Sequence, residues 1–314
     1  MKVLVTGGAG FIGTHLVERL LELGNEVLCV DNFLLGRKEN VLKFKENANY
    51  SFLELDVSDT DKFCKALDKY QFDMIYHLAA NSDIMKSGVV PGIDFDNTFK
   101  TTFSVLELMR IKKIKKLFFA STSAIYGDKK NKLLKEKEGS LAPISYYGGA
   151  KLAGESFISS YSYMNDIDAM IFRFPNVIGP NLTHGVIFDF YNKLKANNKE
   201  LEILGNGKQN KQYIYVDDLI DCIIYMTIDN SFFGVNIYNV GVNGSTSVKE
   251  IADIVCDILG YKDVLYKYTG GSVGWRGDVS KFKYDISKIT KYGWTPKYSS
   301  RDAVVLTVKS LLEK

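Results

Sequence analysis

Residues 6–13 read Thr6-Gly7-Gly8-Ala9-Gly10-Phe11-Ile12-Gly13, and this stretch decides the fold. An apolar run, Val3–Val5, precedes it, and a run with helical spacing, Thr14–Leu23, follows it. Glycines spaced three apart permit a tight turn from strand to helix and a close approach of phosphate to backbone. The N-terminus of the following helix offers free N–H groups and a positive dipole end. The stretch therefore predicts a cradle for a diphosphate, although a tight turn without a ligand has the same pattern.

Strands and helices alternate along the first 173 residues. Apolar runs predict strands and helical spacing predicts helices. After the first helix we expect the strands Glu26–Val30, Ser51–Leu55, Met74–Leu78, Lys116–Ala120 and Ala169–Phe172 and the helices Phe95–Arg110 and Tyr146–Tyr163. Such strands join through right-handed crossovers into a mostly parallel sheet. The sequence predicts an α/β fold of the Rossmann type, a doubly wound parallel sheet with helices on both faces.

The pattern changes after Phe174. Glycine and asparagine become frequent, as in Gly205-Asn206-Gly207, and the expected elements become less regular. We expect residues 1–173 to form a dinucleotide-binding Rossmann domain, with later segments returning to it, and residues 174–314 to form mainly a smaller α/β lobe. Open α/β sheets bind ligands beyond the carboxyl ends of their strands, so this lobe is expected to complete a substrate site there.

The composition excludes several classes of function. The 314 residues carry a net charge of +3, which is too small to indicate nucleic acid or a membrane surface as a partner. The three histidines and four cysteines show no metal-ligand spacing and no CxxC pair, so we expect no metal site and reduced thiols. The chain begins directly with a strand and has no long apolar run, which favours a cytoplasmic protein without a leader or a membrane span.

A carboxylate stands where the second strand ends. Asp31 follows Gly13 by 18 residues, a position from which it can accept hydrogen bonds from the adenosine ribose and repel a 2′-phosphate. Asn32 can share the ribose. Arg37 and Lys38 are near enough to hold a 2′-phosphate, but the carboxylate favours NAD over NADP.

Tyr147 and Lys151 are four residues apart in a predicted helix, and residues with this spacing share a helix face. A lysine ammonium lowers the pKa of a nearby phenol from its usual value of about 10, so Tyr147 can act as a base near neutral pH. Tyr146 is a rival phenol, but it lies off that face. Ser121-Thr122-Ser123 ends the fifth predicted strand, where hydroxyl side chains either bind a substrate oxygen or form a turn.

These motifs together resemble the NAD-dependent epimerase/dehydratase family of the extended short-chain dehydrogenases/reductases. The resemblance covers essentially the whole chain. It is carried by residues 6–13 (TGGAGFIG), Asp31-Asn32, His77-Leu78-Ala79-Ala80, Ser121–Ser123 with Tyr126-Gly127, Tyr147-x-x-x-Lys151, residues 173–180 (RFPNVIGP), residues 213–218 (YIYVDD) and Arg276-Gly277-Asp278. His184-Gly185-Val186-Ile187 and Gly205-Asn206-Gly207 are most similar to prokaryotic UDP-glucose 4-epimerases.

The resemblance implies a role for each matching residue. Tyr147 is the expected general base, Lys151 is expected to bind the nicotinamide ribose and tune Tyr147, and Thr122 is the expected catalytic hydroxyl. The residues expected to bind NAD are Gly7, Gly10, Phe11, Ile12, Gly13, Asp31, Asn32, Asp56, Val57, Leu78, Ala79, Ala80, Asn97, Ala120, Tyr147, Lys151 and Phe174. The residues expected to bind a nucleotide-diphosphate sugar are Thr122, Ser123, Tyr147, Asn176, Val186, Lys211, Tyr213, Arg276 and Asp278. Two long helices pair between subunits in this family, so a homodimer is also expected.

Departures from the family pattern bear on the reaction. Ser123-Ala124 stands where the 4,6-dehydratases carry Asp-Glu, and the UDP-glucuronate decarboxylases carry Glu at the position of Ala124, which disfavours both reactions. Lys211 replaces an arginine that is usual in 4-epimerases. Trp275 stands three residues before Asp278, where a second arginine is frequent, and Arg276 is shifted by one. The identity of the nucleotide and of the sugar therefore stays open.

The resemblance favours a 4-epimerase acting on a UDP-hexose. Tyr147 would take the proton of the C4 hydroxyl while hydride passes to NAD, and the 4-keto sugar would turn over and regain the hydride on its other face. One alternative is a dehydrogenase that releases the 4-keto product, with a GDP-sugar or GDP-heptose as substrate. Another is a non-catalytic NAD sensor, against which the intact set of Thr122, Tyr147 and Lys151 speaks.

Overall fold

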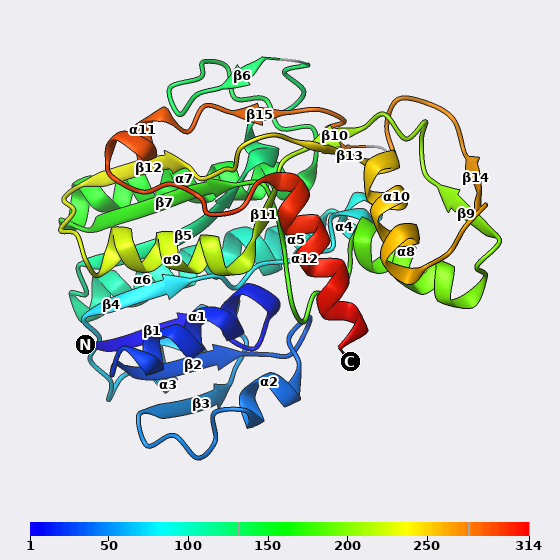
Figure 1. Cartoon of the computed structure of the whole chain (residues 1–314). Helices are drawn as coiled ribbons and strands as arrows, with labels where there is room; N and C mark the ends of the chain where they lie inside the picture. Colours follow the sequence, from blue (N-terminus) through cyan, green and yellow to red (C-terminus); the bar gives the residue numbers. More distant parts are fainter. Residues whose placement is uncertain (131, 276, 314) are drawn as a thin grey trace. The chain divides into compact units, whose positions relative to one another are not determined.

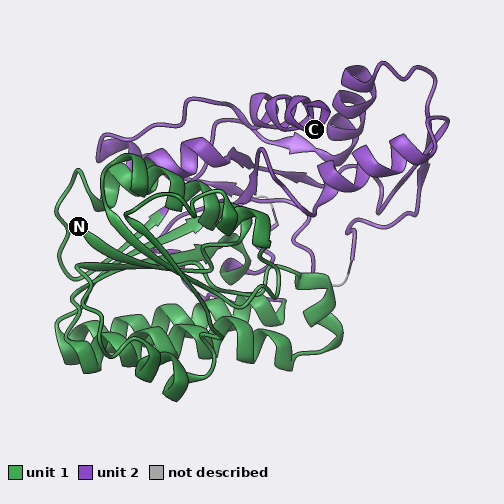
Figure 2. Ribbon diagram, turned by 90° about the horizontal axis from the view of Figure 1, so that it is seen from below, with its two compact units in different colours: residues 1–125, 145–173, 222–238 green, residues 126–144, 174–221, 239–314 purple. Residues whose placement is uncertain are grey.

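A computed structural model describes residues 1–130, 132–275 and 277–313. Internal contacts divide the chain into two units, each assembled from separate segments (Figure 2). Unit 1 contains Met1–Ile125, Ser145–Arg173 and Cys222–Tyr238, and unit 2 contains the described residues of Tyr126–Ile144, Phe174–Asp221 and Asn239–Lys314. The chain therefore passes between the units at five junctions, which follow residues 125, 144, 173, 221 and 238.

The centre of unit 1 is a parallel sheet. Among the described residues, seven strands lie in the order β3-β2-β1-β4-β5-β7-β12 (Figure 1). Their bounds are β1 Lys2–Thr6, β2 Glu26–Asp31, β3 Tyr50–Glu54, β4 Met74–His77, β5 Lys116–Thr122, β7 Asp168–Phe174 and β12 Val235–Asn239. β1 pairs in parallel with β2 on one side and β4 on the other, so the strand order reverses at β1. This order confirms the predicted doubly wound α/β sheet.

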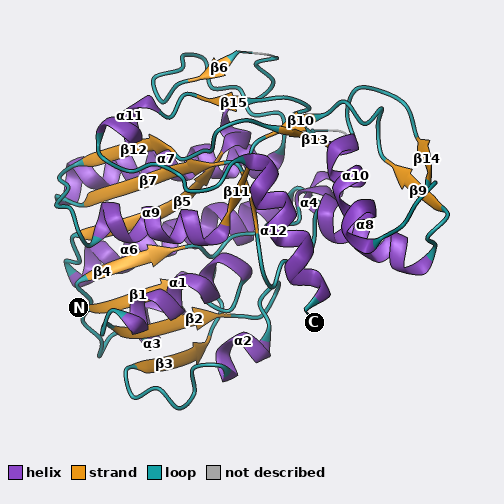
Figure 3. Ribbon diagram, viewed as in Figure 1, coloured by secondary structure: helices purple, strands orange, loops and turns teal. Residues whose placement is uncertain are grey.

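Helices lie on both sides of the strands of unit 1 (Figures 2 and 3). They include α1 Phe11–Glu22, α2 Lys38–Leu42, α3 Thr60–Ala66, α4 Ile84–Val89, α5 Gly92–Asp94, α6 Thr101–Lys112 and α7 Tyr146–Asn165. α1 buries Leu16, Val17 and Leu20, one apolar face of an amphipathic helix. α6 packs between α3 and α7, and these helices bury Phe63 and Ile158 in the core of the unit.

The predicted helix Phe95–Arg110 consists of two parts. Phe95–Lys100 form a π-helix, η1, and α6 continues from it to Lys112. π-Helices take more residues per turn than α-helices and are frequent at functional sites. Hydrophobic spacing did not predict this change, because phenylalanines that repeat every four residues suit either kind of turn.

Unit 2 is built from short elements. Its strands pair two by two: β8 Asn176–Ile178 with β11 Tyr213–Tyr215, β9 Glu200–Ile203 with β14 Leu265–Tyr268, β10 Asn210–Lys211 with β13 Thr246–Ser247, and β6 Leu133–Leu134 with β15 Lys283–Tyr284. Its helices include α8 Val186–Ala196, α10 Val248–Leu259, α11 Ser287–Lys291 and α12 Ser300–Leu312, whereas α9 Val216–Thr227 begins in unit 2 and ends in unit 1. α12 contacts α8, α10 and β11 and so holds these pieces together.

Three general properties follow from the described residues. None of the described helices combines the length and the apolar character that a bilayer span requires. Within the same residues, no three His, Cys, Asp or Glu side chains gather as metal ligands. All four cysteines are free thiols.

Candidate active site

The glycine turn has the close-packed geometry that its sequence predicts. Gly7 has a φ of +75°, and a Cβ there would lie 2.6 Å from the backbone nitrogen of Ala79. A Cβ on Gly13 would lie 2.2 Å from the carbonyl oxygen of Gly7. Gly10 is the N-cap residue of α1, and no side chain caps this end of the helix. The uncapped N–H groups and the helix dipole fit the two phosphates of a dinucleotide.

Asp31 is the last residue of β2 and is buried. Its two carboxylate oxygens accept the backbone N–H groups of Ala9 at 3.0 Å and of Phe33 at 2.8 Å. Burial raises the pKa of this carboxyl group, and the two N–H bonds oppose the rise. Each oxygen keeps a further lone pair for a ribose hydroxyl. Lys38 is close enough in the sequence to hold a 2′-phosphate. In the structure its Nζ atom lies over the ring of Phe33, 5.7 Å from the ring centroid.

The remaining residues expected around NAD have mixed surroundings. Residues 78–80 follow β4 directly, beside the glycine turn. Asp56 is exposed, and its carboxylate accepts the N–H of Ser58 at 2.8 Å, which closes a turn after β3. The amide of Asn97 donates to the carbonyl of Ile93 at 3.1 Å. Outside these groups, Asn32 is exposed, Val57 is buried in unit 1 and Phe174 is half-buried in unit 2.

The expected catalytic residues of unit 1 lie together. The N-terminus of α7 is fixed by Ser145, whose hydroxyl accepts the N–H of Gly148 at 3.1 Å. Tyr147 and Lys151 follow on one face of α7, and the phenol of Tyr147 shares a hydrogen bond with the hydroxyl of Thr122. The Nζ atom of Lys151 lies 6.0 Å from the centroid of the Tyr147 ring.

A buried carbonyl and an aromatic ring hold Lys151 in place. Its Nζ atom donates to the carbonyl of Ala120 at 2.7 Å and lies 4.7 Å from the centroid of the Phe119 ring. Both contacts come from β5, the strand that also carries Thr122. Tyr146, by contrast, is 54 % exposed, in agreement with its place on another face of the helix.

The charges around this pair set its proton chemistry. Burial raises the pKa of Tyr147, the carboxylate of Asp94 raises it further, and the bond to Thr122 lowers it. Burial also lowers the pKa of Lys151 to about 7, although the carboxylates of Glu155 and Asp94 oppose this. The phenol therefore needs a neighbouring cation to lose its proton near neutral pH, and Lys151 needs a neighbouring anion to remain that cation.

Two carboxylates at this site were missed by sequence reasoning. Glu155 continues the spacing of four that joins Tyr147 to Lys151, so its position on the same face was available from the sequence. Asp94 is buried beside the start of η1, and its Oδ2 atom has no hydrogen-bond partner among the described residues. No local pattern marks Asp94, because it is brought near α7 by the packing of the short helices α4 and α5 and of η1.

Several of the expected substrate residues cluster within unit 2. Tyr213 is buried in β11 and hydrogen-bonds the side chain of Asn176 in β8. Lys211 pairs with the carboxylate of Asp278 at 2.5 Å, and the second oxygen of Asp278 accepts the N–H of Gly274 at 3.3 Å. The structure thus brings four of the expected substrate residues together in two pairs, Tyr213 with Asn176 and Lys211 with Asp278. Of the others, Val186 is the first residue of α8, Ser123 directly follows β5, and Arg276 lies outside the described residues.

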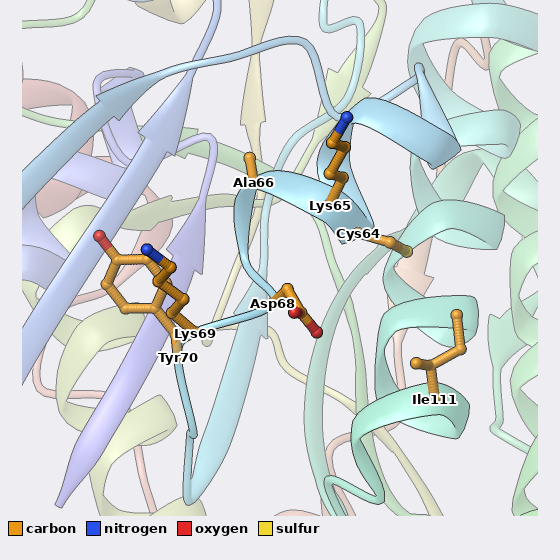
Figure 4. A pocket seen from close by; sticks show the side chains of 7 residues that line it. All are labelled: Cys64, Lys65, Ala66, Asp68, Lys69, Tyr70 and Ile111. Atoms are coloured by element: carbon orange, nitrogen blue, oxygen red, sulfur yellow. The ribbon is translucent and has the colours of Figure 1, made fainter.

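A surface hollow of unit 1 lies apart from these residues (Figure 4). Cys64, Asp68, Tyr70 and Ile111 are among its lining residues, and they come from the ends of α3 and α6 and the segment after α3. These helices end where the next strand of a parallel sheet begins. The hollow therefore belongs to the amino ends of the strands, whereas ligands of open α/β sheets bind at the carboxyl ends.

Known proteins with similar sequence and structure point to one family. The model of the NAD dependent epimerase/dehydratase family matches residues 3–241. The UDP-glucose 4-epimerase of Thermotoga maritima, solved with UDP-glucose, is 30 % identical with a TM-score of 0.87, over 100 % of this chain and 99 % of that one. The UDP-glucuronic acid 4-epimerase of Bacillus cereus, solved with UDP-glucuronic acid and NAD, is 28 % identical with a TM-score of 0.88, over 100 % and 99 %. UDP-glucuronic acid decarboxylase 2 of Arabidopsis thaliana is 28 % identical over 100 % of this chain and 69 % of its own length.

Proposed function

This chain belongs to the NAD-dependent epimerase/dehydratase family, and on that basis we propose that it is a nucleotide-sugar 4-epimerase acting on a UDP-hexose. The observation that carries the proposal is the arrangement of three residues in unit 1. Thr122 hydrogen-bonds the phenol of Tyr147, and Lys151 lies on the same face of α7 as Tyr147. Ala124 favours an epimerase over a decarboxylase, because the side chain at that position has no carboxylate.

The two units have different proposed roles. Unit 1 is the NAD-binding part: the turn of residues 6–13 takes the pyrophosphate, Asp31 the adenosine ribose and Lys151 the nicotinamide ribose. Unit 2 takes the diphosphate end of the nucleotide sugar through Asn176 and Lys211. The four free thiols agree with a cytoplasmic location.

Proton transfer in the proposed reaction falls to this chain. NAD, when bound, supplies the hydride chemistry at C4 of the sugar. Tyr147 removes the proton of the C4 hydroxyl, and Thr122 bonds and orients the same oxygen. Lys151 stabilises the phenolate, which burial alone disfavours. Tyr147 returns its proton after the 4-keto sugar has turned over, so the cycle consumes no second substrate.

A panel of UDP-, GDP- and CDP-sugars, incubated with the purified protein without added NAD, tests this function. We expect the C4 epimer of a UDP-hexose, identified by NMR, with no accumulation of NADH. A released 4-keto sugar with accumulating NADH would identify a dehydrogenase. Loss of carbon dioxide from UDP-glucuronic acid would identify a decarboxylase, and bound NAD without turnover of any sugar would identify a sensor.

Replacing Asp31 should change the choice of cofactor. In Asp31→Asn one oxygen remains to accept backbone N–H, but the charge that binds the ribose and repels a 2′-phosphate is lost. Hydrogen bonds to charged groups contribute about 1.5–3 kcal/mol, so we expect NAD to bind about 10- to 100-fold more weakly. We also expect the affinity for NADP to approach that for NAD. Titration of both cofactors measures this. A wild-type protein that prefers NADP would show that the ribose argument is wrong.

We also propose that the protein is a homodimer. Phe95, Phe99, Phe157 and Phe103 form an aromatic stripe along η1, α7 and α6. The ring centroids are 6.0 Å apart for Phe95 and Phe99, 5.1 Å for Phe99 and Phe157, and 6.4 Å for Phe157 and Phe103. Phe95 is 59 % exposed and Phe157 is 40 % exposed. A contiguous apolar patch on a surface marks an interaction site. Two other apolar residues of these helices, Leu106 and Ile158, are fully buried and belong to the core instead.

The dimer is tested by Phe157→Glu, which places a carboxylate within the stripe. Burying an unpaired charge in an apolar interface is strongly unfavourable, so we expect this variant to be a monomer. Tyr163→Glu is the matched control, because Tyr163 is also on α7 and is 87 % exposed. It should remain dimeric. Light scattering at micromolar concentration gives the masses, and a monomeric wild type would contradict the proposal.

A further inference from the structure

We propose that Glu155 is a positioning residue that fixes the end of β5, which carries Thr122, against the face of α7 that carries Tyr147 and Lys151. The proposal rests on the proposed function, since Tyr147 and Lys151 are taken as the reacting pair. Glu155 forms hydrogen bonds to Ser121 and Arg173 rather than to the phenol or the ammonium, and its charge acts on Lys151 from one helical turn away.

Glu155 is the centre of a buried hydrogen-bond network. Its Oε1 atom accepts the hydroxyl of Ser121. Arg173, on β7, donates its Nε to Oε1 at 3.0 Å and to Oε2 at 3.2 Å, and its Nη2 to Oε2 at 2.6 Å. Glu155, Arg173 and Ser121 are only 6, 3 and 1 % exposed. The network therefore joins three elements of unit 1: α7, β5 and β7.

Ser121 connects this network to the reacting groups. It lies between Ala120, whose carbonyl accepts the ammonium of Lys151 at 2.7 Å, and Thr122, whose hydroxyl bonds Tyr147. α7 is thus tied to the end of β5 one helical turn apart, by Lys151 to Ala120 and by Glu155 to Ser121. Two hydrogen bonds fix the orientation of α7 relative to the end of β5, whereas one bond alone would let α7 rotate about it. The bond between Thr122 and Tyr147 therefore depends on both.

The network also bears on the charge of Lys151. The carboxylates of Glu155 on α7 and Asp94 on α5 and the ring of His77 on β4 interact electrostatically with the pair, and Arg173 on β7 is bonded to Glu155. Burial and the ammonium of Lys151 lower the pKa of His77, so its ring is neutral. Glu155 and Asp94 favour the ammonium form of Lys151. Loss of the Glu155 charge would lower the pKa of Lys151, so Lys151 would lose its proton at a lower pH. The neutral amine would then stabilise the Tyr147 phenolate less than the ammonium does.

A merely structural ion pair would have a different signature. Replacing a buried ion pair by well-packed apolar groups of similar volume is often neutral for stability, so a merely structural pair is expected to affect the fold and not the kinetics. A positioning role instead predicts that turnover and its pH dependence change even when the fold is kept. Ser121→Ala separates the two parts of the role, because it removes one tie to the strand without touching a charge.

The test compares Glu155→Gln, Ser121→Ala and the wild type in turnover, KM and pH profile with the UDP-hexose that the panel identifies. For Glu155→Gln we expect kcat to fall by about tenfold or more with KM within about twofold, as for a misplaced reacting group. The limb of the profile that rises with pH should move to higher pH. For Ser121→Ala we expect a lower kcat without that movement. A lower melting temperature with unchanged kcat and pH profile would overturn the proposal.

Two further variants guard the test. Glu155→Gln leaves the buried charge of Arg173 without its partner, so if it fails to fold, Glu155→Gln combined with Arg173→Gln replaces it. A folded double variant with the wild-type kcat and pH profile would overturn the proposal. Glu107→Gln is the matched control. Glu107 also accepts hydrogen bonds from an arginine, Arg110, and from a hydroxyl, that of Tyr161, but it lies at the partly exposed side of α6 and α7. Its kinetics should be those of the wild type.

A measurement without turnover separates this proposal from the proposed function. NMR titration of the Lys151 side chain, assigned by its loss in Lys151→Met, should give a lower pKa in Glu155→Gln than in the wild type. If no sugar is epimerised but this pKa still falls, the function is wrong and the coupling of Glu155 to Lys151 stands. If the wild type epimerises and neither the kinetics nor this pKa changes, the positioning role is wrong.

Discussion

Tyr147→Phe is expected to lower turnover by about 10²-fold or more, the loss typical of a missing general base. Only the hydroxyl is removed, and the ring keeps its place on α7 beside Lys151. We therefore expect an unchanged melting temperature and unchanged NAD binding. Steady-state rates measured on the preferred sugar give the loss, and cofactor content after purification gives the binding.

Tyr146→Phe is the control for this experiment. It removes an identical hydroxyl one residue away, from a side chain that is more than half exposed. We expect nearly wild-type turnover. A comparable loss in both variants, or a normal rate in Tyr147→Phe, would place the base on another residue.

Lys151→Met is expected to have the second large effect, on both cofactor binding and turnover. Methionine keeps most of the apolar stem against Phe119 but removes the ammonium that bonds Ala120. The proposed hydrogen bond from this ammonium to the nicotinamide ribose of NAD is lost as well. Because a hydrogen bond from a charged group contributes about 1.5–3 kcal/mol, NAD should bind about tenfold more weakly or worse. Turnover should fall by about 10²-fold, because the phenol of Tyr147 loses its cation and its pKa rises. The rising limb of the pH profile then moves to higher pH.

Lys112→Met is the matched control for Lys151→Met. Lys112 is largely buried, lies in unit 1 and also donates to a backbone carbonyl, that of Asp68, but at the end of α6 where the hollow of Figure 4 lies. Its loss should leave NAD affinity and pH profile unchanged. Equal effects in the two variants would mean that the loss at Lys151 is one of general stability.

The frame of unit 1 could be predicted because its signals are local. The glycine turn, the apolar strands and the spacing from Tyr147 to Lys151 each lie within a few consecutive residues. β12 has no such signal: two of its five residues, Val235–Asn239, are asparagines, and its partner β7 ends much earlier in the chain, at Phe174. Only tertiary pairing defines this edge strand.

The same limit applies to the site. The spacing of four also extends from Lys151 to Glu155, but sequence reasoning missed this carboxylate, and spacing alone gives no partner for it. The partners, Ser121 and Arg173, come from the ends of two strands. The place of Asp94 depends on α5, which it ends, and on η1, which the regular spacing of phenylalanines concealed. The sequence therefore predicts a reacting pair but missed the buried charges that lie beside it in the structure.

The five passages of the chain between its units restrict how its gene can be shortened or recombined. A truncated product that ends at Arg173 would lack β12 and expose the edge of β7, whose unpaired N–H and C=O groups invite aggregation. A cassette for unit 2 would need three separate inserts in register, because the unit is encoded by residues 126–144, 174–221 and 239–314. Diversification of substrate choice on this scaffold is therefore expected to proceed by point substitutions rather than by exchange of modules.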